Sequence, residues 1–226
     1  QVLRRLPRPP PRAALSDALD LAEVVPPMPE LAGVPVGPGG EGPLRIAFPH
    51  RLEPDKDPVA FADALVRAAS RGASFEVELL GGRPQKASPE ITEALARLAP
   101  WLRNSEHIED RARYLEVLGH CDLVASTARH EFFGVAFAEA MAAGCSPLAP
   151  GRLNYPALLA DHDGGEAGTG TYLDLPDLTD RLVALASAPR LLRGAPARGA
   201  ARDAVMPFDS APSSRELDRV VEGLAP

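Results

Sequence analysis

Short apolar segments alternate with helical segments from Arg45 onward, and this alternation constrains the fold more than any other feature. Strands are expected at RIAF (45–48), SFEVELLGG (74–82), EHIE (106–109), CDLVAST (121–127), SPLAPG (146–151) and GTYLDL (170–175). Helices are expected at 57–72, 88–102, 110–121, 135–143, 155–160 and 178–187, and the remainder of the chain is expected to be mostly helical. Such alternation predicts an α/β fold, with a parallel sheet and helices on both of its faces.

The first 43 residues differ from the rest in composition. LPRPPPR (6–12) and VVPPMPELAGVPVGPGGEGP (24–43) are rich in Pro and Gly, and one short helix is expected between them, over 13–25. We therefore expect residues 1–43 to be a linker or the remnant of a preceding domain, and residues 44–226 to form one domain. Because residue 1 is Gln, a fragment or a processed product is expected.

The net charge and the cysteine content limit which classes of function are expected for this chain. The net charge of −7 is unlike the strong basic excess of a dedicated nucleic-acid binder. Four arginines between residues 4 and 12 could touch a polyanion, but a solvated tail is favoured. Cys121 and Cys145 lie in apolar runs, which indicates buried, reduced thiols and a cytoplasmic protein. No run approaches the ~20 apolar residues of a membrane span, and no secretory signal opens the chain.

Two glutamates frame the segment EFFGVAFAE. Glu139 lies inside an otherwise apolar helix, where an unpaired carboxylate would cost several kcal/mol. A basic side chain could compensate it, and so could two hydroxyl donors such as those of a ribose. Glu131 precedes the helix at the end of a predicted strand, beside Phe133 and Gly134, whose N–H groups could hold a phosphate. On spacing alone, structural roles for both glutamates are favoured.

A second candidate site is the loop PHRLEPDKDP, which follows the first predicted strand. Ligands bind beyond the carboxyl ends of strands in sheets of this kind. Arg51 and Lys56 are cations suited to a diphosphate there. The alternative is a surface ion-pair network with the neighbouring acids Glu53, Asp55 and Asp57.

Other signals are weaker. Gly81 and Gly82 follow a strand, where glycines mark turns as often as ligand contacts. The five histidines lack metal-ligand spacing, so no metal is expected. Tyr155 and Pro156 open a helix and are interpreted as structural.

Taken together, these motifs resemble the retaining GT-B glycosyltransferases of family 4, over about residues 44–224. The glutamate pair resembles that family's E-x7-E motif, and the Arg51–Lys56 loop resembles its diphosphate clamp. PHRLEPDKDP, STARHEFFGVAFAEA and GRLNYPALL resemble most closely a branch that transfers mannose from GDP-mannose to queuosine in tRNA. The resemblance implies the C-terminal, Rossmann-like half of a GT-B fold, which binds a nucleotide-sugar donor without a metal or other cofactor.

The resemblance also implies roles for individual residues. Glu131 would contact the donor sugar, Glu139 would bind the ribose in place of any side-chain partner, and Arg51 and Lys56 would stabilise the leaving diphosphate. The implied catalytic residues are Glu131, Arg51 and Lys56, and the implied donor-binding set is Arg51, Lys56, Gly81, Gly82, Glu131, Phe133, Gly134, Val135 and Glu139.

Two departures from the family pattern affect these expectations. Asp57 replaces the glycine that often follows the clamp lysine. Residues 1–43 are too short to supply the acceptor-binding amino-terminal domain. We therefore expect tRNA, if it is the acceptor, to bind mostly through that missing domain. This chain alone is expected to bind donor weakly and to catalyse poorly or not at all.

Overall fold

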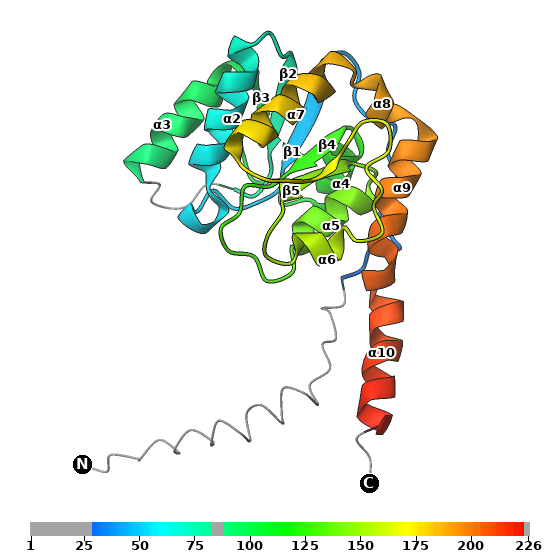
Figure 1. The fold of residues 1–226 in the computed structure, drawn as a ribbon. Coiled ribbons are helices and arrows are strands. Elements are labelled where there is room, and N and C mark those ends of the chain that lie inside the picture. Colours follow the sequence, from blue (N-terminus) through cyan, green and yellow to red (C-terminus); the bar gives the residue numbers. More distant parts are fainter. Residues whose placement is uncertain (1–28, 83–87, 224–226) are drawn as a thin grey trace, which may run out of the picture.

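A six-stranded parallel sheet forms the centre of the domain, with helices on both faces (Figure 1). The computed structural model describes residues 29–82 and 88–223. The spatial order of the strands is β3-β2-β1-β4-β5-β6. The strands are β1 (Leu44–Phe48), β2 (Phe75–Leu79), β3 (Leu102–Asn104), β4 (Leu123–Ala125), β5 (Ser146–Pro150) and β6 (Gly170–Tyr172). The α/β, Rossmann-like fold expected from the sequence is therefore confirmed.

The connections between strands are helical. The helices are α2 (Pro58–Ser70), α3 (Pro89–Leu98), α4 (Arg111–Gly119), α5 (Val135–Ala142), α6 (Tyr155–Leu158), α7 (Leu175–Ser187), α8 (Arg190–Arg193), α9 (Ala195–Val205) and α10 (Ser210–Gly223), with 3-10 turns η1 (Pro54–Lys56), η2 (Ala99–Trp101) and η3 (Met206–Phe208). Four helices begin at a side chain that accepts a hydrogen bond from the first turn: Asp57, Ser88, Asp110 and Asp174. The expected cap at Ser88 is confirmed.

Side chains of each strand alternate between two cores. Ile46 and Phe48 of β1 face α2, α3 and α7, whereas Ala47 between them faces the side of α4, α5 and α6. The second core contains small residues from α5, including Ala138, Ala140 and Ala142, so this helix lies close to the sheet. The α10 helix extends beyond the body of the domain (Figure 1).

One predicted strand is wrong. Residues 106–109 form no strand, and β3 lies earlier, starting at Leu102, the last residue of the helix expected over 88–102. The α3 helix ends before Pro100, which lies in η2, and the chain then pairs with β2. The Asn104 amide donates to the carbonyls of Leu79 and Glu106, and this bonding turns the chain out of the sheet before 106–109.

Residues 29–43, called the strap below, pack along α9 and the ends of α4 and α5. The Gly37 N–H donates to the Ala143 carbonyl at 3.1 Å. Three arginines of α8 and α9 (Arg193, Arg198 and Arg202) donate to strap carbonyls. The strap is therefore fastened to the domain by guanidinium groups.

Some expectations lie outside the described residues. These are the short helix over 13–25 and the arginine cluster before it. Within the part of the chain that the structure describes, no helix has the length and apolar character needed to cross a membrane.

Candidate functional site

The candidate site lies where the strand order reverses. β1 pairs with β2 on one side and with β4 on the other, so the chain leaves β1 and β4 in opposite directions. In open parallel sheets, ligands bind in the crevice beyond the strand ends at such a switch point. The loop after β1 contains Arg51 and Lys56, and the loop after β4 contains Glu131.

The structure brings Lys56 and Glu131 into direct contact. The Lys56 ammonium lies 3.1 Å from Glu131 Oε2, and both side chains are nearly buried, at 11% and 13% exposed. Lys56 Nζ also donates to the His130 carbonyl at 2.7 Å and lies 3.2 Å from Asp55 Oδ2. The three acceptors match the three N–H donors of an ammonium group, so a bound anion must displace one of them.

Backbone bonds hold the two loops together. The N–H groups of Arg129 and His130 donate to the Asp55 carbonyl at 2.8 and 3.2 Å. The Thr127 hydroxyl bonds to the carbonyls of Lys56 and Asp57 at 3.0 and 2.9 Å. These hydrogen bonds therefore fix the positions of the two loops that contain Lys56 and Glu131.

The start of α5 lies beside this pair. Gly134 has φ +92 and serves as the N-cap, so it brings no side chain to the first free N–H groups of the helix. The predicted donor residues Phe133 and Val135 flank it, half-buried and 40% exposed respectively. Glu131 folds over this turn and accepts from the Phe132 N–H at 3.1 Å. The uncapped helix start is suited to an anion.

Glu139 has a partner within the protein. Arg111, at the start of α4, donates from Nη2 to Glu139 Oε1 at 2.8 Å. The expectation that no side chain satisfies Glu139 is therefore wrong, because α4 lies beside α5 and brings in a basic group. Arg111 is 56% exposed and Glu139 13% exposed. Since a carboxylate accepts several hydrogen bonds, the pair leaves capacity for a ligand hydroxyl.

The other predicted donor residues lie at the same edge of the sheet. Arg51 is 68% exposed and pairs with Glu53 at 3.2 Å. The surface ion-pair network that was the alternative prediction for this loop is therefore present in part. Gly81, after β2, packs against the same loop: a Cβ there would lie 2.0 Å from the His50 carbonyl oxygen. Gly82 has φ +75 and its Leu52–Gly82 backbone bond joins the two loops.

Asp57 adopts the left-handed conformation, with φ 51. This explains how it can replace glycine after the clamp lysine, because aspartate tolerates this region better than most residues. Its carboxylate also accepts from the Ala60 N–H at 3.2 Å and from Arg129 Nε at 2.7 Å. Asp57 is therefore stabilised at this position because it caps the N-terminus of α2.

Sequence reasoning missed residues that support the site. His50 is buried one residue beyond the end of β1, with Nδ1 3.8 Å from Glu131 Oε2. From the loop after β5, Arg152 donates to the Thr127 and Ala128 carbonyls, and the Asn154 amide donates to the Phe133 carbonyl. The position of His50 just beyond a strand end was the one signal that could have identified it.

Tyr155 is buried and structural, as interpreted from the sequence. Its hydroxyl lies 2.7 Å from Ser126 Oγ, and its ring packs edge-on against Phe137. Together with Arg152 and Asn154, it ties the loop after β4 to the loop after β5.

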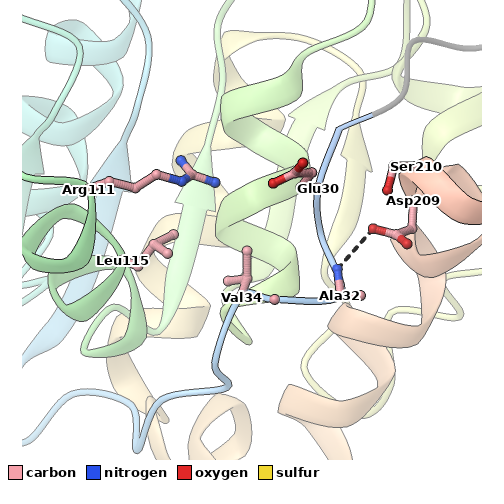
Figure 2. Close-up of a pocket in the computed structure, with 8 residues that line it drawn as sticks. Glu30, Ala32, Val34, Arg111, Leu115, Asp209 and Ser210 are labelled. Carbon is pink, nitrogen blue, oxygen red and sulfur yellow. Dashed lines mark hydrogen bonds between the residues drawn. The ribbon is translucent and has the colours of Figure 1, made fainter.

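Two hollows border the site. One, of about 360 Å³, lies between the loops after β1, β4 and β5 and the start of α7, and includes Asp57 and Thr127. The other, of about 310 Å³, lies between the strap, α4 and the start of α10 (Figure 2). Arg111 reaches toward this second hollow from α4, and Glu30 and Asp209 lie across it. It is lined by none of the switch-point residues.

Within 29–82 and 88–223, no group of three or more His, Cys, Asp or Glu side chains is arranged to hold a metal ion.

Solved structures of glycosyltransferases share this fold. TarM of S. aureus, crystallised with Fondaparinux, alpha-GlcNAc-glycerol and UDP, superposes with a TM-score of 0.71 and 14% identity over 93% of this chain and 42% of TarM. The apo form of the lipopolysaccharide outer core galactosyltransferase WaaB gives 0.69 and 14% over 90% of this chain and 56% of WaaB. This chain therefore shares its Rossmann-like fold with part of each of these glycosyltransferases, as expected from the motifs for one half of a GT-B fold.

Sequence comparison agrees with this class. No family model matches the chain. The chain is 35% identical to the tRNA-queuosine alpha-mannosyltransferase of Drosophila melanogaster over 150 residues, which is 66% of this chain and 38% of the relative. It is 33% identical to the D-inositol 3-phosphate glycosyltransferase of Mycobacteroides abscessus over 125 residues, 53% of this chain and 27% of that relative. The predicted resemblance to glycosyltransferases, and to the queuosine mannosyltransferase among them, is confirmed.

Proposed function

We propose that residues 44–226 form the donor-binding domain of a retaining glycosyltransferase that uses GDP-mannose. The observation that carries this proposal is the contact between Lys56 and Glu131 at the switch point of the sheet, 3.1 Å apart, beside the uncapped start of α5. A cation and a carboxylate held there suit a sugar diphosphate, because one binds phosphate oxygens and the other binds hydroxyl groups. The 35% identity to a mannosyltransferase supports the choice of sugar.

In the proposed reaction, the bond between the anomeric carbon and the diphosphate oxygen breaks, the acceptor hydroxyl oxygen bonds to that carbon, and the hydroxyl proton passes to the released diphosphate. The negative charge that develops on the diphosphate is stabilised by Arg51, Lys56 and the first N–H groups of α5. We propose that these groups act without a metal. Because three acceptors surround Lys56, donor binding exchanges Asp55 or Glu131 for phosphate.

In this proposal the two glutamates bind different parts of the donor. Glu131 binds hydroxyls of the sugar, and Glu139, one turn into α5, binds the ribose hydroxyls. Arg111 orients Glu139 in the meantime, at 2.8 Å. The remaining residues of the proposed donor site form its backbone surface at the same edge of the sheet. They are Gly81, Gly82, Phe133, Gly134 and Val135.

The proposed acceptor is queuosine in tRNA, as named for the Drosophila relative. A second candidate is a small glycoside or lipid acceptor; the match to the D-inositol 3-phosphate glycosyltransferase favours a small acceptor over tRNA. A third is a nucleotide-sugar-binding module without activity. Because the chain spans 38% and 27% of these relatives, acceptor binding through a further domain is part of the proposal. The buried free thiols of Cys121 and Cys145 suit the cytoplasm, where tRNA is found.

Titration calorimetry of the full chain with GDP-mannose and UDP-glucose tests the proposal. We expect heat of binding with GDP-mannose and weaker binding with UDP-glucose. Preference for UDP-glucose would overturn the choice of donor, and binding of neither would favour an interaction module without a donor.

Glu139→Gln is expected to weaken GDP binding by roughly 10- to 100-fold, since a charge-assisted hydrogen bond contributes about 1.5–3 kcal/mol. Calorimetry with GDP measures this change. The matched control is Glu116→Gln, which alters an exposed glutamate paired with Arg113 on α4. Equal affinities for wild type and Glu139→Gln would remove Glu139 from the donor site.

Arg51→Ala combined with Lys56→Ala is expected to reduce the preference for GDP over GMP by at least about tenfold, because both cations are assigned to the diphosphate. Calorimetry with each nucleotide measures the ratio. Arg67→Ala combined with Arg97→Ala removes the same charge from α2 and α3 and should leave the ratio unchanged. A preference that survives in the first variant contradicts the clamp assignment.

A further inference from the structure

His50 is a buried polar group that the proposed reaction does not yet use. It lies one residue beyond the end of β1, after Pro49, and its side chain is 3% exposed. Its ring lies edge-on to Phe48 at 5.1 Å and nearly parallel to Phe137 of α5 at 6.4 Å. Two aromatic rings therefore fix the plane of the imidazole at the floor of the candidate site.

One ring nitrogen points toward the site. Nδ1 lies 3.8 Å from Glu131 Oε2, and Nε2 is buried without a hydrogen-bond partner. A buried N–H without a partner is rarer than a buried acceptor without one. The tautomer with its proton on Nδ1 is therefore favoured, because it directs the donor to the carboxylate and leaves a lone pair, not an N–H, on the unpartnered Nε2.

Burial, with a smaller contribution from the Lys56 ammonium, favours the neutral form of this imidazole. Lys56 and Asp55 face it from η1 and Glu131 from the loop after β4, while Phe137 of α5 is apolar and Gly81 presents only backbone. Burial, followed by the Lys56 ammonium, lowers the pKa of His50 from 6.5 to about 3, against the opposing effect of Asp55. A neutral imidazole can donate one hydrogen bond without adding a second cation beside Lys56.

We propose that His50 is a positioning residue that holds Glu131 once the donor is bound. This inference rests on the proposed function and takes Glu131, of the two carboxylates beside Lys56, as the one that the diphosphate displaces. Glu131 Oε2 then loses its 3.1 Å partner while the side chain is still nearly buried, and only Oε1 keeps a donor, the Phe132 N–H. A buried carboxylate oxygen without a donor is costly, so Oε2 requires a new one. The Nδ1–H group is close enough that a shift of under about 1 Å would complete the bond. His50 thereby orients Glu131 toward the sugar hydroxyls.

The test measures how much the sugar adds to the affinity for the donor. Calorimetry of the full chain gives the Kd for GDP and the Kd for GDP-mannose, and the readout is the first divided by the second. His50→Leu keeps an apolar side chain in the space and removes the donor, and we expect this ratio to fall by about tenfold while GDP affinity stays unchanged. His50→Asn places an amide donor near the position of Nδ1 and is expected to restore most of the ratio. His50→Gln, whose amide lies nearer the position of Nε2, is expected not to restore it.

A double-mutant cycle with Glu131→Gln completes the test. We expect His50→Leu to have little further effect on the ratio once Glu131 is neutral, because the two residues act as a unit. Additive effects overturn the inference, and so does an equal loss of affinity for both ligands, which would mark a structural role. If His50→Leu does not fold, the Asn and Gln variants give the same comparison. Failure of the wild type to bind GDP overturns the proposed function itself, whereas wild-type binding with an unchanged ratio in His50→Leu overturns only this inference.

Discussion

Arg198→Met is expected to lower the free energy of unfolding by about 3–5 kcal/mol. Arg198 is 2% exposed, and its guanidinium donates to four carbonyl oxygens: Gly37 at 2.8 Å, Cys121 at 3.0 Å, and Gly119 and Ala143 at 2.9 Å each. Methionine would fill most of the volume but would leave these buried acceptors without a donor. The loss corresponds to a fall in Tm of roughly 6–20 °C for a domain of this size.

The position of the carbonyls explains why arginine is required. Gly119 ends α4 and Ala143 caps the C-terminus of α5, so two helix ends direct their partial negative charges at one guanidinium. Gly37 belongs to the strap, and the same group therefore also fastens residues 29–43. Arg198→Lys keeps the charge but not the planar fork and is expected to lose most of the same stability.

Thermal and urea unfolding of the wild type, Arg198→Met and Arg198→Lys measures this loss of stability. Arg67→Met is the matched control, since Arg67 is exposed on α2, and it should change stability by less than about 0.5 kcal/mol. A loss in Arg198→Met no greater than in the control would show that the four carbonyls find other partners.

The sheet and its ligand edge could be predicted because they follow from local patterns. Apolar runs and helical periodicity fixed the element types, and in a parallel sheet the loops after β1 and β4 must share one edge. The contact between Lys56 and Glu131, 75 positions apart in the chain, is a consequence of that topology. The placement of both candidate motifs at one edge therefore required no knowledge of packing.

Contacts between side chains on separate elements could not be predicted in this way. Arg111 reaches Glu139 only because α4 packs beside α5. Arg198 lies 161 positions from Gly37, and nothing in the α9 sequence distinguishes it from Arg202, the other arginine of that helix. β3 was misplaced because its three residues are only partly buried and lack an apolar run. Long-range packing decided each of these cases.

Acid is expected to destabilise the wild-type domain more steeply than a His50→Asn variant. The folded-state pKa of His50 is lowered from 6.5 to about 3, first by burial and then by Lys56. Between these values the unfolded chain binds a proton that the folded chain does not, so the free energy of unfolding falls as the pH falls. One such proton costs about 1.4 kcal/mol per pH unit, or roughly 4–5 kcal/mol over the whole window, and the loss ends below about pH 3.

Urea unfolding at a series of pH values from about 6 to about 4 measures this difference, and its readout is the slope of stability against pH. Burial also lowers the pKa of His162, which adds a slope of the same sign to both proteins and cancels in the comparison. The absolute stability of His50→Asn will differ because a ring is lost between Phe48 and Phe137, but a residue without a titrating group cannot contribute to the slope. Parallel slopes for the two proteins would mean that His50 is protonated in the folded state. His50 would then be a second cation beside Lys56, which would contradict its role as a neutral donor to Glu131.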